Sequence, residues 1–189
     1  GYERVDPGYT TFGGYFFTDD FENYTFNFAQ RLWQNKINLS ANIGTQRDLL
    51  ETKANGQSRL VFSTNLVFTP SERFNANVNL STFKSNTYIR NLIKELKRES
   101  TLIPIDTLNY TQINRNFATN ISYTIRQKPE QTQTISVSGS IMDAANMQGN
   151  IIRQRQASQV FNGQLTYTFG LPLQKFTANI GYHYNLNTI

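Results

Sequence analysis

The amino-acid sequence predicts an all-β fold, a meander of about eight to ten antiparallel strands. Two regularities support this prediction: apolar and polar residues alternate strictly in many stretches, and the connections between these stretches alternate between short and long. The stretch FNANVNLSTF, residues 74–83, has apolar residues on one parity and three asparagines and a serine on the other. Successive side chains of a strand point to opposite faces, so this segment has one apolar and one polar face.

The same alternation predicts the remaining strands. With the stretch YTTFGGYFF at 9–17 they number about nine, and the others run over 24–32, 37–44, 60–68, 117–125, 135–141, 161–169 and 176–184. We expect three hairpin registers, in which Leu32 pairs with Ile37, Phe68 with Phe74, and Phe169 with Phe176. A slip of one residue would place every apolar side chain opposite a polar one.

The connections fall into two length classes. The short ones lie at 33–36, 69–73, 126–134 and 170–175, and the long ones at 48–58, 84–109 and 143–156, with 18–23 as a brief exception. Outer-membrane barrels have short turns at one end and longer loops at the other. The pattern therefore predicts an antiparallel transmembrane β-barrel, either closed by these strands or forming an arc of a larger barrel.

Composition excludes several classes of protein. Hydrophobic residues make up 38% and charged residues 16% of the chain, against typical values of about 45% and 25%. No apolar run approaches the roughly 18 residues of a membrane-spanning helix, and the absence of cysteine excludes disulfides and thiolate metal sites. The net charge is +5, but the basic residues fall mainly in loops and form no stripe with stacking aromatics, so we expect no nucleic-acid partner.

The polar parity is rich in asparagine and serine and poor in Lys and Glu. The water-exposed face of a soluble sheet normally carries those charges, whereas short amides and hydroxyls suit a crowded polar lumen. We therefore expect the apolar face to meet lipid and the polar face to line the lumen. The lumen-facing candidates are Arg31, Arg59, Asn75, Asn77, Asn79, Arg126 and His183. Periodicity alone also fits a soluble β-barrel that turns its apolar face inward and binds an apolar ligand.

Aromatic residues lie beside the short turns, where an interfacial girdle is expected. The girdle candidates are Phe68, Phe74, Phe169 and Phe176. In one interpretation the arginines among the lumen candidates give a pore a preference for anions, because charged rings set selectivity in channels. The more frequent role of such arginines is to hold lumen carboxylates or loops in place.

One segment, 86–100, has a helical pattern. Ile89, Leu92, Ile93 and Leu96 are spaced i, i+3, i+4 and i+7 within the longest loop. The expectation is one short loop helix. Its apolar side either covers the barrel mouth or docks a partner, or else it only packs on neighbouring loops.

No residue pattern points to catalysis. His183 is the only histidine, so a cluster of histidine metal ligands is excluded, and we expect no Ser-His nucleophile pair. Asp19, Asp20 and Glu22 carry the oxygen ligands that a hard cation prefers, but an acidic turn is the more frequent meaning of such a run. We expect a non-enzymatic protein without catalytic residues, cofactor or metal.

The stretches GYERVDPGYTTFGGYFFTDDFENYTF (1–26) and FTPSERFNANV (68–78) resemble the barrel regions of Bacteroidota-type outer-membrane β-barrel proteins, either TonB-dependent-receptor-like barrels or the translocon of type 9 secretion. The resemblance implies a place in the cell outer membrane, contact with its lipid, and a part in transport or secretion. It also implies contacts with other envelope proteins through the external loops. The chain departs from the receptor pattern because it has no plug domain, no energy-coupling segment and no terminal aromatic residue.

A small structural or adhesion-type barrel is the alternative function within the same fold. Single-chain bacterial barrels have an even number of strands, and the sequence predicts about nine. We therefore expect residues 1–189 to be one barrel domain and a piece of a longer chain.

Overall fold

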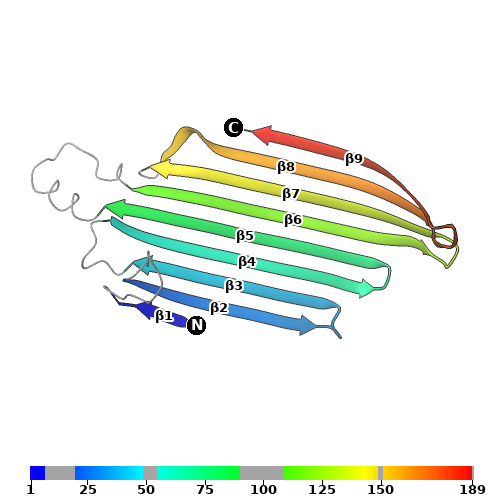
Figure 1. The fold of residues 1–189 in the computed structure, drawn as a ribbon, viewed down its shortest axis with the longest axis horizontal. Helices are drawn as coiled ribbons and strands as arrows, with labels where there is room; N and C mark the ends of the chain where they lie inside the picture. The colour runs from blue at the N-terminus through cyan, green and yellow to red at the C-terminus, as the bar shows by residue number, and fades with distance from the viewer. Residues whose placement is uncertain (7–19, 49–54, 90–108, 149–150, 189) are drawn as a thin grey trace, which may run out of the picture.

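The computed structural model describes residues 1–6, 20–48, 55–89, 109–148 and 151–188, which form one antiparallel sheet of nine strands (Figure 1). The strands are β1 (Tyr2–Val5), β2 (Phe21–Leu32), β3 (Ile37–Asp48), β4 (Asn55–Ser71), β5 (Phe74–Ile89), β6 (Tyr110–Gln127), β7 (Thr132–Gln148), β8 (Ile151–Leu171) and β9 (Phe176–Thr188). Each strand pairs with the strand before it and the strand after it, as in a meander, so the all-β antiparallel prediction is confirmed. The sheet is open, with β1 and β9 at its two edges.

Helical structure in the described residues is limited to one 3-10 turn, η2 (Pro172–Gln174). None of the helices there has the length and apolar character needed to cross a membrane. The prediction of a loop helix is wrong for residues 86–89, because these residues continue β5 and pair with β4. The rest of that segment, including Leu92, Ile93 and Leu96, lies outside the described residues.

Hairpin registers follow the expected parity in all three cases. The β2–β3 register is confirmed, whereas in β4–β5 and β8–β9 the partner lies two residues farther along than expected. Phe68 pairs with Ala76, and Phe169 pairs with Ala178. Alternation repeats every two residues, so a shift of two leaves apolar opposite apolar and cannot be detected from the pattern.

Several connections are shorter than predicted because the strands extend into them. β7 and β8 together occupy most of 143–156, where a long loop was expected. Likewise β5 continues to Ile89, and β2 begins at Phe21 inside the expected 18–23 turn. The expected strand at 9–17 lies outside the described residues, and β1 pairs with the beginning of β2 instead.

Cross-strand pairing places two contrasting rows of side chains beside each other across eight strands, from β2 to β9. One row consists of Leu32, Ile37, Phe68, Ala76, Ile121, Val137, Leu165 and Tyr182. The next row consists of Arg31, Asn38, Val67, Asn77, Asn120, Ser138, Gln164 and His183. Neighbouring rows point to opposite faces, which we call the apolar face and the amide face.

Within the described residues, no second layer of protein covers the apolar face of the sheet. Among the residues that the structure describes, no large side chain is fully buried. On the apolar face Ile180 is 75% exposed and Phe26 63% exposed. A soluble domain of this length buries most of its apolar surface, so some other medium or layer has to cover this face.

The β2–β3 turn has an unusual backbone. Trp33, Gln34 and Asn35 all have positive φ, at 53°, 54° and 67°, and the Lys36 amide donates to the Trp33 carbonyl at 3.1 Å. Primed turns of this kind match the twist of a hairpin, but the left-handed conformation strains residues with a side chain, and asparagine least among them.

We expect Gln34→Gly to raise the free energy of unfolding by about 0.5–1 kcal/mol, because glycine enters the left-handed region without strain. Asn35→Gly is the matched control and should change stability less, since asparagine already tolerates this conformation. Urea unfolding followed by far-UV circular dichroism measures both variants. Equal effects at the two positions would contradict the strain at Gln34.

Candidate functional site

The apolar face carries a continuous band of apolar side chains. On β4 the band runs from Leu60 to Phe68, and on β8 from Phe161 to Phe169. Each stretch covers about nine residues, close to the length with which a tilted strand crosses a bilayer. Strands β4 to β8 are 16 to 21 residues long, so they continue past the band toward the long-loop end.

The band crosses the hydrogen-bond ladder diagonally. One row of paired residues changes from apolar on β2–β4 to polar on β5–β9, and its members are Phe26, Ile43, Phe62, Thr82, Arg115, Asp143, Gln159 and Thr188. At the short-turn end the apolar pattern stops at Leu32 on β2 but continues past Tyr182 to Phe176 on β9. Strands tilted against a flat apolar layer would meet its borders at such shifting positions.

Aromatic rings cluster at the short-turn end of the band. Trp33 stacks on Phe68 with ring centroids 6.2 Å apart, and Phe68 meets Phe74 edge-on at 5.9 Å. The Lys36 ammonium lies 5.4 Å from the centroid of the Trp33 ring. An amphipathic tryptophan ring beside a cation is typical of the boundary between hydrocarbon and water.

The amide face is held together by hydrogen bonds between side chains of neighbouring strands. Asn65 on β4 donates to Asn79 and, at 3.3 Å, to Asn77, and Asn79 donates to Asn77 at 2.7 Å. Similar bonds join Asn42 to Ser63, Asn162 to Ser140, and Asn185 to Asn162. Much of the polar side-chain surface in the middle of this face is therefore satisfied within the sheet.

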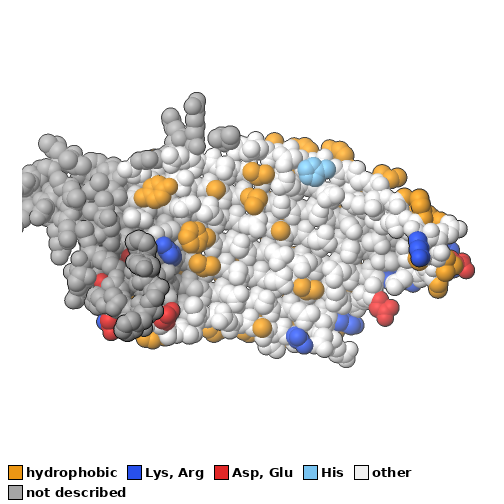
Figure 2. Space-filling view, in the orientation of Figure 1, with side chains coloured by type: hydrophobic (Ala, Val, Ile, Leu, Met, Phe, Trp, Pro, Cys, Tyr) orange, Lys and Arg blue, Asp and Glu red, His pale blue; other side chains and the backbone are white. Residues whose placement is uncertain are grey.

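Charge is almost absent from the amide face. Figure 2 looks onto the face with the single histidine (pale blue), where white side chains prevail over scattered orange ones. Arg31, Asp48 and Arg59 lie on β2–β4. In the described side chains of β5, β6, β7 and β9, and of β8 from Gln156 onward, this face carries no Lys, Arg, Asp or Glu.

The structure brings most lumen-facing candidates onto one face. Arg31, Arg59, Asn75, Asn77, Asn79 and His183 all have amide-face parity. The four girdle candidates, Phe68, Phe74, Phe169 and Phe176, lie on the apolar face at the short-turn end. Of the loop-helix candidates, Ile89 ends β5.

Arg126 does not join the other lumen candidates. A β-bulge between Thr124 and Arg126 inserts an extra residue, and Arg126 then pairs with Gln133, which shares its parity with Ile135. The register thus places Arg126 on the apolar-face side, at the short-turn end. A bulge inverts the alternation of the residues that follow it.

Sequence reasoning missed an apolar cluster on the amide face. Val61, Phe83, Met142 and Val160 line a hollow of about 520 Å³ on β4, β5, β7 and β8. Each of them sits at the polar parity of its strand, and this departure from the alternation is the signal that could have revealed the cluster.

The acidic candidates form no metal centre in the described residues, where no group of three metal-ligating side chains occurs. Asp19 lies outside them. Glu22 is 7% exposed and accepts from the Arg47 guanidinium at 3.0 and 3.2 Å. This ion pair links β2 to β3 and gives Glu22 a structural role.

Comparisons of the chain with protein-family models, curated proteins and solved structures gave no match.

We expect Asn79→Ala to lower the free energy of unfolding by about 1 kcal/mol, because it removes hydrogen bonds to two neighbouring amides. Asn75→Ala is the control: Asn75 shares the strand and the face, but its side chain makes no hydrogen bond within the described part of the chain. Urea titration of the two variants compares them, and an equal loss would show that the amide cluster adds nothing specific.

Proposed function

We propose that this sheet is part of the wall of a transmembrane β-barrel in a bacterial outer membrane and takes part in transport or secretion. The apolar face lies against lipid and the amide face lines a water-filled interior. The observation that carries the proposal is the diagonal apolar band on one face, backed by a nearly uncharged amide face on the other.

The size of the band supports a bilayer as the covering medium. About nine residues at a rise of about 3.3 Å, tilted by about 45°, project to roughly 20 Å, close to the apolar height of outer-membrane barrels. The Arg115–Asp143 pair, with 3.7 Å between Nη1 and Oδ2, stands on the same face just outside the band on β6 and β7. A charge pair costs little there and much at the centre of a bilayer.

The composition of the amide face weighs against a soluble barrel. In that alternative the apolar face would turn inward and the amide face would meet bulk water, where exposed sheets carry charges for solubility and against edge pairing. Five neighbouring strands, β5–β9, lack them on this face within the described side chains. Amides and hydroxyls that bond one another fit a confined wet interior better.

Trp33 is the only tryptophan and offers a native probe of depth. The chain is reconstituted in vesicles of brominated lipids. We expect lipids brominated near the headgroups to quench the Trp33 fluorescence more strongly than lipids brominated near the ends of their acyl chains, because the girdle lies at the interface. A protein that needs no lipid would show no quenching by either lipid.

A matched pair of variants tests which face of the sheet contacts lipid. In a Trp33→Phe background, lipids brominated near the ends of their acyl chains should quench the tryptophan fluorescence of the Ile121→Trp variant strongly and that of the Asn120→Trp variant weakly. Neighbouring residues of β6 point to opposite faces. Equal quenching at the two positions, or the reverse order, would overturn the assignment of the faces.

Conductance separates transport from a structural or adhesion-type barrel. We expect the complete barrel that contains this sheet, reconstituted in a planar bilayer, to give discrete conductance steps with little preference between cations and anions, since few charged side chains line the amide face in the described residues. The chain boiled in detergent before reconstitution is the control. Lipid-inserted protein that gives no steps would favour the structural alternative.

A further inference from the structure

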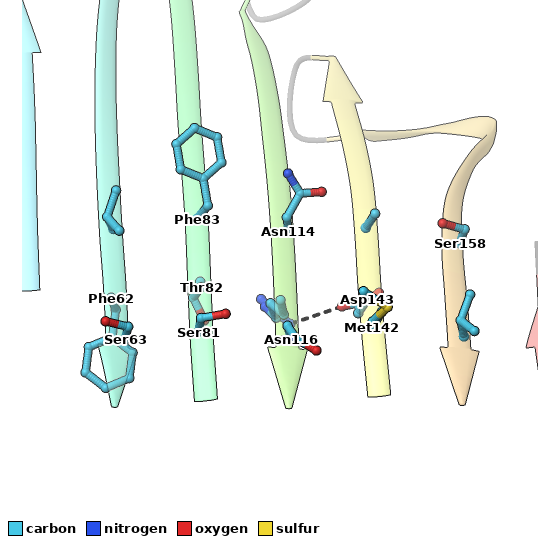
Figure 3. Close-up of a pocket in the computed structure, with 14 residues that line it drawn as sticks. Phe62, Ser63, Ser81, Thr82, Phe83, Asn114, Asn116, Met142, Asp143 and Ser158 are labelled. Atoms are coloured by element: carbon cyan, nitrogen blue, oxygen red, sulfur yellow. Dashed lines mark ion pairs between the residues drawn. The ribbon is translucent and has the colours of Figure 1, made fainter. Parts of the chain in front are cut away.

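The hollow lined by Val61, Phe83, Met142 and Val160 is the least expected feature of the amide face, and we call it the amide-face hollow (Figure 3). Its apolar side chains form two cross-strand pairs, Val61 with Phe83 on β4–β5 and Met142 with Val160 on β7–β8. Between these pairs lies β6, which contributes Asn114. Both pairs lie on the face that the proposed function turns toward water.

The apolar side chains of the hollow are partly exposed, which is unfavourable if water fills it. Val61 is 47% exposed and Met142 is 52% exposed. Leaving apolar surface in water costs about 25 cal/mol per Å², and the rest of this face is polar. An occupant with an apolar body would recover that free energy.

Ser63 in the hollow accepts from Asn42, but the other polar side chains on this side of the hollow are unused. Asn114, Asn116, Ser81 and Ser158 line it, and their side chains make no hydrogen bond within the described part of the chain. Asn65, Asn77 and Asn79, in contrast, bond one another in the middle of the same face. Each free amide both donates and accepts, so it can bond a hydroxyl or an amide of an occupant.

The charge of the lining limits the occupant. Arg115 and Asp143 are among the residues that line the hollow, but the register turns their side chains to the apolar face, where they pair with each other, as the dashed line in Figure 3 marks. Arg59 lines the adjoining hollow and donates to Gln57 at 2.8 Å. Among the described residues that line the amide-face hollow itself, no charged side chain points from this face, so a charged molecule there would lose its hydration without gaining a counterion.

We infer that the amide-face hollow binds an uncharged small molecule that has an apolar body and hydroxyl or amide groups at its edge. Its volume of about 520 Å³ lies within the range of small-molecule sites, which combine an apolar lining with a few polar groups. The inference rests on the proposed function, because the amide face has to be accessible to water for a ligand to reach the hollow.

Protection of a single cysteine tests the inference, because the chain has none of its own. Ser158→Cys places a thiol in the hollow, and Ser136→Cys places one on the same face outside it. Each full-length variant is reconstituted in lipid nanodiscs and labelled with a water-soluble maleimide. The probe is phenylnaphthylamine, a neutral molecule with apolar rings and one N–H group.

We expect the probe to slow labelling at position 158 saturably, by about tenfold, and to leave labelling at position 136 unchanged. The anionic analogue anilinonaphthalene sulfonate should not protect position 158 at the same concentration. In the Ser158→Cys background, Phe83→Ala should raise the half-protecting concentration by about fivefold or more, and Asn75→Ala should not change it. Phe83→Leu replaces Phe83→Ala if that variant does not fold, with a smaller rise expected.

Other outcomes overturn the inference, and they separate it from the proposed function. If both cysteines react quickly and the probe protects neither, the hollow does not bind this class of molecule. The same holds if the anionic analogue protects position 158 equally well. In both cases the amide face is still accessible to water, so the proposed function stands. If position 158 is unreactive without probe while position 136 reacts quickly, the hollow is already covered by protein. If both cysteines are inaccessible from water, the assignment of the faces fails as well.

Discussion

The feature on which the whole structure depends is the ladder of backbone hydrogen bonds that joins each strand to the next from β1 to β9, with register shifts in the described pairings of β4–β5, β6–β7 and β7–β8. Away from these register shifts each strand pairs in register with the next, so paired residues of successive strands share a face. The row from Leu32 to Tyr182 stays apolar across eight strands, while the row from Arg31 to His183 stays polar except for Val67. Two surfaces of opposite chemistry thus stand back to back on a sheet one residue thick.

Such a sheet cannot be stabilised in the way that a globular core is. Its described part holds no fully buried large side chain, so the free energy of apolar burial has to come from whatever covers the apolar face. Lipid would cover the apolar face without a second protein layer. The backbone inside the sheet is compatible with lipid, because strand pairing satisfies its N–H and C=O groups. The amide face needs no such cover, since asparagines and serines there bond across strands and tolerate water.

Much of the fold and part of the candidate site could be predicted from the sequence. The strand centres, the β2–β3 register and the common face of Asn75, Asn77 and Asn79 follow from alternation, which is local. Arg126 was placed on the wrong parity because alternation cannot locate a bulge. Residues 86–89 and 143–156 were misjudged because pairing with neighbouring strands extends β5, β7 and β8 beyond their alternating centres.

By itself, the sequence determined that this protein has strands with one apolar and one amide side, since side chains two residues apart share a face in any sheet. Only the tertiary structure decided which residues of different strands lie together, because register depends on turns, bulges and pairings over long distances in the chain. The diagonal course of the apolar band arises in this way. So does the amide-face hollow, whose lining reaches from Val61 on β4 to Val160 on β8 only because four successive strand pairings align these strands.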